Sequence, residues 1–370
     1  MNYNPRIARL SDWLASERIS AALFVDVEGR RDPNIRYLTG QPGDALLFVL
    51  SDGKAILIPW DINLARAIAQ AGEMIPYSDY GRSLSVAVEA IVQREKLAGS
   101  IEVSATTPHL VVEELQKVSG GCEIVCRSKG LDELLTNLRM IKDPQELKLI
   151  ERAAEITNEL LVLLEVFLTQ STDVTEVGVA LFLEGEARKR GCEGMSFESL
   201  VAGPARSYGI HAFPAYTGAP FAEAGMSILD FGVLVEGYPS DVTVTVLRGP
   251  LSPKQQEMVD LVQQAYDLAV GLARPGTEVR TISAAVDELF QRNGYSMPHS
   301  LGHGLGLQVH EGPYLRNKPE IVTKLERGMV FTIEPGLYDP GAGGVRLEND
   351  LLVSDGGTRI LTTSRMLRLR

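Results

Sequence analysis

The sequence predicts a two-domain protein in which an α/β domain is followed by an α+β domain. Its 370 residues exceed one ordinary compact domain, and 45% of them are hydrophobic, which is enough for two sizeable cores. Strand-length apolar runs alternate with helical patterns up to about residue 130, whereas longer helices and paired strands follow. We place the domains at residues 1–138 and 139–370.

The first domain has the alternating pattern of an α/β fold. Ile7, Leu10 and Leu14 share one face of its opening helix. Residues 40–43 lack the Lys-Ser/Thr of a P-loop, so the sequence predicts no phosphate-binding loop there. We expect helices at residues 5–18, 61–72, 84–97 and 107–119, and strands at residues 21–27, 45–50, 55–59, 101–103 and 123–127.

A short helix at residues 131–138 leads into the second domain, which opens with a strong helix start. Asp143 can cap a helix whose first residue is Pro144, and Glu146 lies in the first turn. We expect helices at residues 143–169, 174–190, 252–272 and 279–293, and strands at residues 226–233, 237–247, 329–334 and 344–353.

Charge and cysteine content exclude several classes of function. A formal net charge of −12 disfavours nucleic acid and anionic membrane surfaces as partners, because both attract basic faces. Three cysteines without paired spacing suit a reducing compartment, and early charged residues interrupt any signal-peptide core. The most apolar run, residues 160–168, contains Glu165 and is too short to span a bilayer. We therefore expect a cytoplasmic protein.

Acidic residues at strand ends indicate a cation site. Asp230 ends an apolar run, and Asp241 lies on the next strand at a position symmetric about residue 235.5. Residues placed in this way face each other in a regular hairpin, and opposed carboxylates repel unless a cation lies between them. A rim of surface acids is the alternative interpretation.

A second carboxylate pair follows the same rule. Glu334 and Glu348 are symmetric about residue 341, which lies in a glycine-rich turn. Two such hairpins gather four negative charges, which two divalent cations would balance. His303 can add a nitrogen donor, because the glycines on both sides of it let the backbone approach an ion. This oxygen-rich set favours Mn²⁺ or Co²⁺, with Zn²⁺ or Fe²⁺ as further candidates.

Several short strings in the second domain also carry a family resemblance: ILDFG (228–232), SDVTVT (240–245), GHGLGLQVHEGP (302–313), EPG (334–336) and GVRLEND (344–350). RMIK (139–142) and NIRYLTG (34–40) extend it over nearly the whole chain. Together they resemble the M24-type metallopeptidases of the creatinase/prolidase/aminopeptidase P superfamily, and Xaa-Pro dipeptidases most. The resemblance implies a pita-bread catalytic domain behind a creatinase-type α/β domain.

The resemblance implies a role for each candidate ligand. Asp230 would hold one metal ion, while Asp241 and Glu348 would bridge both ions. His303 and Glu334 would hold the second ion, and Glu334 would also act as the general base. A hydroxide between the ions would be the nucleophile, because divalent cations lower the pKa of bound water.

Three further histidines are candidates around the metal ligands. His211 matches a family histidine that contacts the scissile region, and His310 matches one that helps to stabilise the tetrahedral intermediate. For both of them a buried histidine bonded to backbone is the structural alternative. His299 is a candidate for supporting the ligands, with a packing role as the alternative.

Two arginines are candidates for contact with substrate or ligand. Arg346 shares a strand face with Glu348 and either orients that ligand or binds a substrate carboxylate, and we prefer orientation. Tyr314 stands where some prolidases carry a basic residue for the dipeptide carboxylate, and the nearby Arg316 is a candidate to replace it.

The resulting prediction is a dinuclear metallopeptidase that cleaves Xaa-Pro dipeptides or short Xaa-Pro peptides, and the resemblance implies a homodimer. Aminopeptidase P activity on longer peptides and hydrolysis of a small non-peptide amide are the enzymatic alternatives. A non-enzymatic binding module and a metal-free creatine-type hydrolase are disfavoured, because all five ligand positions are filled.

Overall fold

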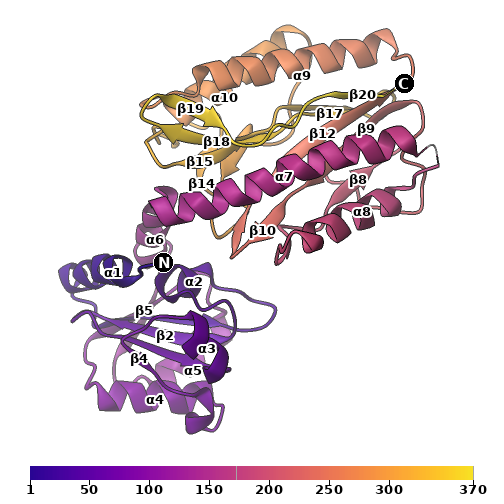
Figure 1. Cartoon of the computed structure of the whole chain (residues 1–370). Coiled ribbons are helices and arrows are strands. Elements are labelled where there is room, and N and C mark those ends of the chain that lie inside the picture. Colours follow the sequence, from indigo (N-terminus) through magenta and orange to yellow (C-terminus); the bar gives the residue numbers. More distant parts are fainter. Residues whose placement is uncertain (172, 370) are drawn as a thin grey trace. The chain divides into compact units, whose positions relative to one another are not determined.

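The computed structural model describes residues 1–171 and 173–369 and contains two compact units, Met1–Arg139 and Met140–Arg370 (Figure 1). Each unit has its own hydrophobic core. Within the described residues, none of the helices combines the length and the apolar character needed to cross a bilayer.

The first unit is built on a mixed sheet with the strand order β4-β3-β2-β1-β5-β6. β1 runs antiparallel to β2 and parallel to β5. Every residue of β1 and β2 is buried, as expected for continuous apolar runs in a sheet covered on both faces. The strands are β1 (Ala21–Asp26), β2 (Ala45–Leu50), β3 (Ala55–Pro59), β4 (Glu73–Met74), β5 (Ser100–Val103) and β6 (Glu123–Cys126). The helices are α1 (Asn4–Glu17), α2 (Pro33–Thr39), α3 (Ile62–Ile68), α4 (Leu84–Arg94), α5 (His109–Val118) and α6 (Leu131–Met140), with a 3₁₀ turn η1 (Tyr77–Tyr80).

The second unit begins with the long helix α7 (Pro144–Gln170), whose start follows the predicted chemistry. The Asp143 side chain accepts hydrogen bonds from the backbone N–H groups of Gln145 and Glu146, and the Glu146 side chain accepts one from the Asp143 N–H. The other helices are α8 (Glu176–Lys189), α9 (Pro253–Leu272) and α10 (Val279–Arg292). The strands are β7 (Gly194–Met195), β8 (Leu200–Ala202), β9 (Gly225–Phe231), β10 (Val233–Val235), β11 (Tyr238–Pro239), β12 (Val242–Arg248), β13 (Gly302–Gly304), β14 (Glu311–Leu315), β15 (Val330–Ile333), β16 (Gly336–Asp339), β17 (Gly343–Arg346), β18 (Asn349–Ser354), β19 (Gly357–Ile360) and β20 (Leu367–Leu369).

The strands of the second unit lie between two pairs of helices (Figure 1). α7 and α8 pack on one side in a core that includes Leu229 and Val244 of the central strands. α9 and α10 pack on the other side in a separate core that includes Phe331 and Leu351. This layering leaves the polar side chains of the strands to converge between the two cores.

Three strands that we predicted as continuous are interrupted, two of them at a candidate ligand. The predicted strand 226–233 breaks at Gly232. The predicted strand 237–247 breaks at Ser240 and Asp241, and the predicted strand 344–353 breaks at Leu347 and Glu348. Regular β-structure would alternate these side chains across the sheet, and the breaks release them from that alternation.

The two hairpins differ in how well their register was predicted. Ile333 pairs with Asn349, and the same register places Glu334 opposite Glu348, as predicted. Asp230, however, pairs with Thr243, so the prediction that it directly opposes Asp241 is wrong. The turn is centred one residue later than expected, because Glu236 and Gly237 both adopt positive φ in a two-residue turn.

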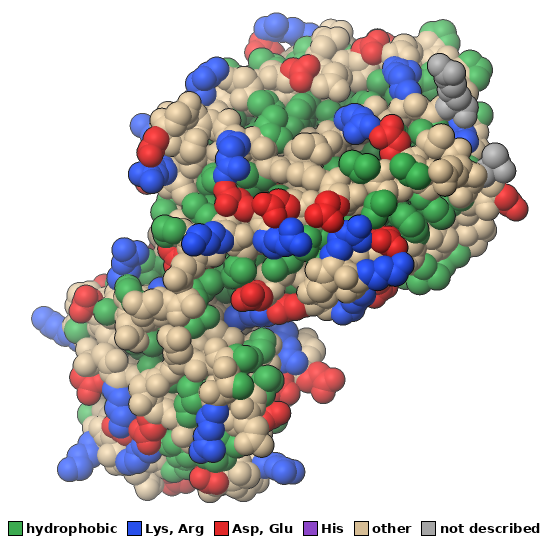
Figure 2. All heavy atoms as spheres, viewed as in Figure 1, with side chains coloured by type: hydrophobic (Ala, Val, Ile, Leu, Met, Phe, Trp, Pro, Cys, Tyr) green, Lys and Arg blue, Asp and Glu red, His purple; other side chains and the backbone are tan. Residues whose placement is uncertain are grey.

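The face of the molecule in Figure 2 carries acidic and basic side chains side by side where α7 crosses the second unit. Ion pairs on this helix include Glu159 with Arg190 and Glu151 with Arg359. Interspersed charges of this kind form a solvated surface, and no uniformly basic surface forms along this helix.

Candidate metal centre

The ten site residues predicted from the sequence all line one cavity of about 870 Å³ in the second unit. Strands β9 and β13 carry two of them, and loops at strand ends carry most of the others. The residues are His211, Asp230, Asp241, His299, His303, His310, Arg316, Glu334, Arg346 and Glu348.

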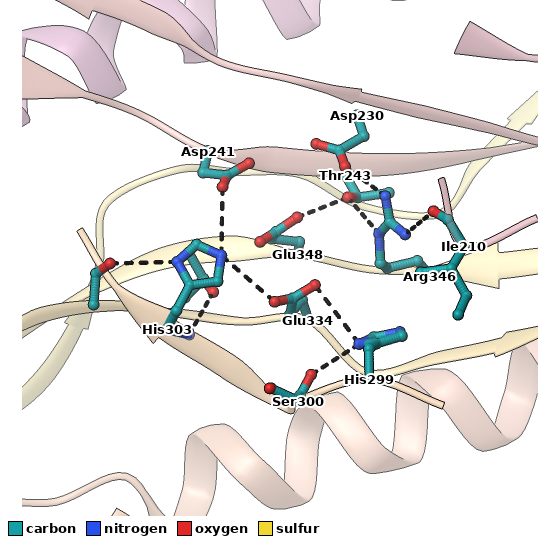
Figure 3. Close-up of polar contacts among 12 residues, drawn as sticks. Ile210, Asp230, Asp241, Thr243, His299, Ser300, His303, Glu334, Arg346 and Glu348 are labelled. Atoms are coloured by element: carbon teal, nitrogen blue, oxygen red, sulfur yellow. Dashed lines mark hydrogen bonds and ion pairs between the residues drawn. The ribbon is translucent and has the colours of Figure 1, made fainter. Parts of the chain in front are cut away.

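A tight group of side chains forms the floor of this cavity (Figure 3). Asp241, His303 and Glu348 each offer a ligand atom within 4.8 Å of the others. The Nε2 atom of His303 lies 3.7 Å from Asp241 Oδ2 and 3.5 Å from Glu334 Oε1. The His303 Nδ1 atom lies 3.3 Å from the Gly304 carbonyl, which assigns the proton to Nδ1 and leaves the Nε2 lone pair facing the acids.

Burial and mutual repulsion control the protonation of this group. Burial first, and then the charge of Glu348, raises the pKa values of Asp241 and Glu334 well above their usual range. Burial first, and then the charge of Asp230, raises the pKa of Glu348 to about 8. Burial lowers the pKa of His303 to about 3. Without a cation the acids therefore retain protons while the imidazole stays neutral.

The donor set fits divalent cations. The Oδ1 atoms of Asp230 and Asp241 are buried and have no hydrogen-bond partner among the described residues. A buried carboxylate oxygen without a partner is costly, and a cation removes that cost. Four carboxylates and one neutral imidazole are ligands of the kind that hold hard or borderline divalent ions.

Arg346 is a buried hub that holds Asp230. It is 2% exposed, and its Nη2 atom donates to Asp230 Oδ2 over 2.5 Å. Its Nε atom donates to Thr243, whose hydroxyl in turn donates to Glu348 Oε2 over 2.7 Å. Its Nη1 atom donates to the Tyr338 hydroxyl. These contacts favour the orienting role and leave little of the guanidinium for a substrate carboxylate.

Thr243 and Tyr338 are members of this network that the sequence did not identify as part of the metal site. The alternation of Asp241, Thr243 and Thr245 along one strand was a usable signal, because buried polar residues two apart share a face. Tyr338 has its hydroxyl 2.9 Å from His299 Nε2. His299 thus joins the network, and burial lowers its pKa to about 4.

The His310 loop is fixed by a buried ion pair. The His310 ring meets the His303 ring edge-on with centroids 4.2 Å apart. The next residue, Glu311, lies 3.0 Å from the Lys142 Nζ atom, and both side chains are buried. A Cβ atom on Gly306 would lie 2.0 Å from the Glu311 carboxylate, so only glycine leaves room for it. The resemblance of RMIK at residues 139–142 was the one sequence signal near this pair.

The two remaining candidates lie at the cavity wall. His211 is an exposed residue of an irregular loop, and it lines the same cavity as Asp230. Arg316 donates from Nε to the Ser300 hydroxyl over 2.9 Å, and its guanidinium lies 5.0 Å from the centre of the Tyr314 ring. Unlike Arg346, Arg316 keeps donors free to reach a ligand in the cavity.

Comparison with known families agrees with this geometry. Residues 148–355 match metallopeptidase family M24, and residues 6–141 match the creatinase/prolidase N-terminal domain. The chain belongs to family M24. It is therefore a metallopeptidase with a pita-bread catalytic part, and the predictions of family and fold class are confirmed.

Relatives of this M24 metallopeptidase match it over almost their whole length. It is 29% identical over 365 residues to the Xaa-Pro dipeptidase of Pyrococcus horikoshii, with 97% of both chains covered. The structure of the Xaa-Pro dipeptidase from Bacillus anthracis superimposes with a TM-score of 0.87, 27% identity and 100% coverage of both chains. An X-Pro aminopeptidase from Thermotoga maritima superimposes with a TM-score of 0.82 and 26% identity, over 96% of this chain and 99% of that chain.

Metal binding to this M24 metallopeptidase is expected to release protons. The pKa of Glu348 near 8 means that the metal-free site holds a proton at pH 7, and a cation must displace it. The affinity of the site for a divalent cation should therefore increase as the pH rises through about 8. Calorimetric titration with Mn²⁺ in two buffers of different ionisation enthalpy measures the released protons. Equal heats in both buffers would contradict the expectation.

Proposed function

We propose that this M24 metallopeptidase hydrolyses Xaa-Pro dipeptides and short Xaa-Pro peptides with two divalent cations, Mn²⁺ or Co²⁺ first. The observation that carries the proposal is that four acids and one neutral imidazole line one cavity, and that two of their buried carboxylate oxygens have no hydrogen-bond partner among the described residues. The names of relatives matched over the whole chain support the substrate class. A homodimer in the cytoplasm is part of the proposal.

We assign the ligands the roles that the family resemblance implies. Asp230 would hold one ion, Asp241 and Glu348 would bridge both, and His303 with Glu334 would hold the second. When bound, the ions would supply Lewis acidity and would lower the pKa of a coordinated water. Glu334 would act as the general base, and its carboxylate lies beside His303 in the cluster.

The remaining side chains act on the substrate. His310 lies against His303 and would donate a hydrogen bond to the oxyanion that forms at the scissile carbonyl. His211 would contact the scissile region from the opposite loop. Arg346 holds Asp230 in place and does not need to touch substrate.

Arg316 would bind the free carboxylate of a dipeptide. Arg316→Met is expected to lower kcat/KM for an Xaa-Pro dipeptide about 10- to 100-fold, mainly through KM, because a hydrogen bond to a charged group contributes about 1.5–3 kcal/mol. The C-terminally amidated dipeptide lacks the carboxylate, so Arg316→Met should change kcat/KM for it only slightly. Steady-state kinetics on both substrates provide the comparison, with Arg327→Met, a surface residue paired with Asp355, as the control. An equal loss on both substrates would rule out carboxylate recognition by Arg316.

Aminopeptidase P activity on longer peptides is the second candidate. Tyr314 occupies a position where some prolidases carry a basic residue, and the structural likeness to an X-Pro aminopeptidase extends over 96% of this chain. Without that basic residue a free carboxylate next to proline is less strongly required.

A substrate panel tests the proposed function. Metal-free protein is incubated with Mn²⁺ or Co²⁺ and with Xaa-Pro dipeptides, Xaa-Pro-Yaa tripeptides and non-proline dipeptides, and released amino acid is measured. Cleavage of Xaa-Pro dipeptides alone would establish dipeptidase activity, and tripeptide cleavage would establish the aminopeptidase. Two bound metals without cleavage of any peptide would contradict the proposal and direct the search to small non-peptide amides.

A further inference from the structure

His211 reaches the cavity from the irregular loop of residues 203–217. Its side chain is exposed, and among the described residues no side-chain hydrogen bond holds the imidazole. His211 nevertheless lines the same cavity as Asp230 and the other metal-site residues. The position of the imidazole therefore depends on how the loop backbone is held.

A single buried carboxylate holds both ends of this loop. Glu176, in the first turn of α8, is fully buried. Its Oε1 atom accepts a hydrogen bond from the Gly203 N–H over 2.8 Å, at the start of the loop. Its Oε2 atom accepts one from the Thr217 N–H over 2.8 Å and one from the Thr217 hydroxyl over 2.6 Å, at the end of the loop. Both oxygens are thus used to close the loop at its base.

The same carboxylate is connected to the part of the loop near His211. Arg206 Nε lies 3.3 Å from Glu176 Oε1, and another nitrogen of Arg206 donates to the Pro214 carbonyl. On the other side of His211, the Ile210 carbonyl accepts a hydrogen bond from Arg346, which also holds Asp230 (Figure 3). The backbone on both sides of His211 is therefore held by charged groups, the buried Arg346 and the partly exposed Arg206.

We propose that Glu176 is a positioning residue, which holds the loop of residues 203–217 so that His211 lies at the metal site. This proposal rests on the proposed function for the role of His211. Glu176 touches no cavity-lining ligand itself, so its effect passes through the loop. In the sequence, Glu176 has the ordinary pattern of a first-turn acid behind a Thr175 cap, so it gave no sign of this role.

Glu176→Gln is the sharpest test, because it keeps the size of the side chain and one acceptor oxygen. The amide nitrogen of the glutamine is itself a donor, and it would face N–H or O–H donors that the carboxylate oxygen accepted from. The ion pair with Arg206 is also lost. We expect kcat to fall about 10- to 100-fold with KM within about threefold, because a displaced catalytic group costs rate at an unchanged binding site. Metal content should stay that of the wild type, and hydrogen exchange at the Gly203 and Thr217 amides should become faster.

Three controls separate positioning from general destabilisation. Glu102→Gln changes another fully buried carboxylate, which accepts from the Leu131 N–H and pairs with Arg127 in the first unit, and it should leave kcat within about twofold. Thr217→Val removes one of the three hydrogen bonds that Glu176 accepts, and it should lose less activity than Glu176→Gln. Thr217→Ser keeps the hydroxyl and should retain the activity of the wild type. The Val variant also keeps the test open if Glu176→Gln does not fold.

A double-mutant cycle completes the experiment. In a His211→Ala background, Glu176→Gln should cost less than about twofold in kcat, because the group that it positions is already gone. A full additive loss, or a normal kcat in Glu176→Gln with a loosened loop, would overturn the proposal. If the wild type cleaves no Xaa-Pro peptide, the proposed function fails separately. The hydrogen exchange of the loop then decides the role of Glu176, and unchanged protection overturns it.

Discussion

Replacing Asp241 by alanine is expected to abolish peptide hydrolysis and to reduce the bound metal below two ions per chain. Asp241 offers a ligand atom within 4.8 Å of those of His303 and Glu348, and its Oδ1 atom has no hydrogen-bond partner among the described residues. Removing it leaves fewer donors for either ion and also removes negative charge that the ions balance. Metal content by mass spectrometry and activity on the cleaved Xaa-Pro peptide are the measurements.

Asp339→Ala is the matched control for this loss. Asp339 lies in the β16–β17 hairpin and pairs with Lys254 at the surface, so its removal should leave both metals and the activity unchanged. Full activity of Asp241→Ala with two ions bound would refute the bridging role. Loss of metal in both variants would show that the assay reports general damage to the fold.

The Glu334–Glu348 hairpin shows what the sequence could predict about the site. The glycine-rich stretch around residue 341 allows only a tight, symmetric turn, so counting outward from it gives the observed register. In the other hairpin, Glu236 takes a positive φ that side chains other than glycine rarely adopt, and this moves the turn by one residue. The acids converge despite this error, because Asp230 and Asp241 both line the cavity that also contains Glu334 and Glu348.

The parts of the site that the sequence did not predict are contacts between residues far apart in the chain. Arg346 contacts Asp230 and Thr243, each more than 100 residues away, and neither periodicity nor spacing records such pairs. Glu176 is the same case, since its partners appear only once the loop has folded back onto α8. By contrast, helix α2 has a local signal in the sequence, since Asp32 caps it and Pro33 is its first residue, and we did not predict it. That miss was one of interpretation.

Replacing His310 by alanine is expected to leave both metals bound and to remove most of the turnover. The ring lies against His303 at the cavity wall, beside the ligands rather than among them. Burial first lowers the pKa of His310 below its usual value, so the imidazole is neutral at pH 7 and can donate one N–H to a developing oxyanion. Losing one such donor costs about 10²- to 10³-fold in kcat.

Two further variants make the His310 test specific. His310→Gln keeps an N–H donor of similar reach and should recover part of the lost kcat, whereas a packing role would respond to side-chain volume alone. His109→Ala removes an exposed histidine of the first unit and should leave kcat unchanged. Because the lowered pKa keeps His310 neutral above about pH 6.5, the loss in His310→Ala should be constant between pH 7 and 9. Normal turnover in that variant would show that the oxyanion is stabilised by other groups.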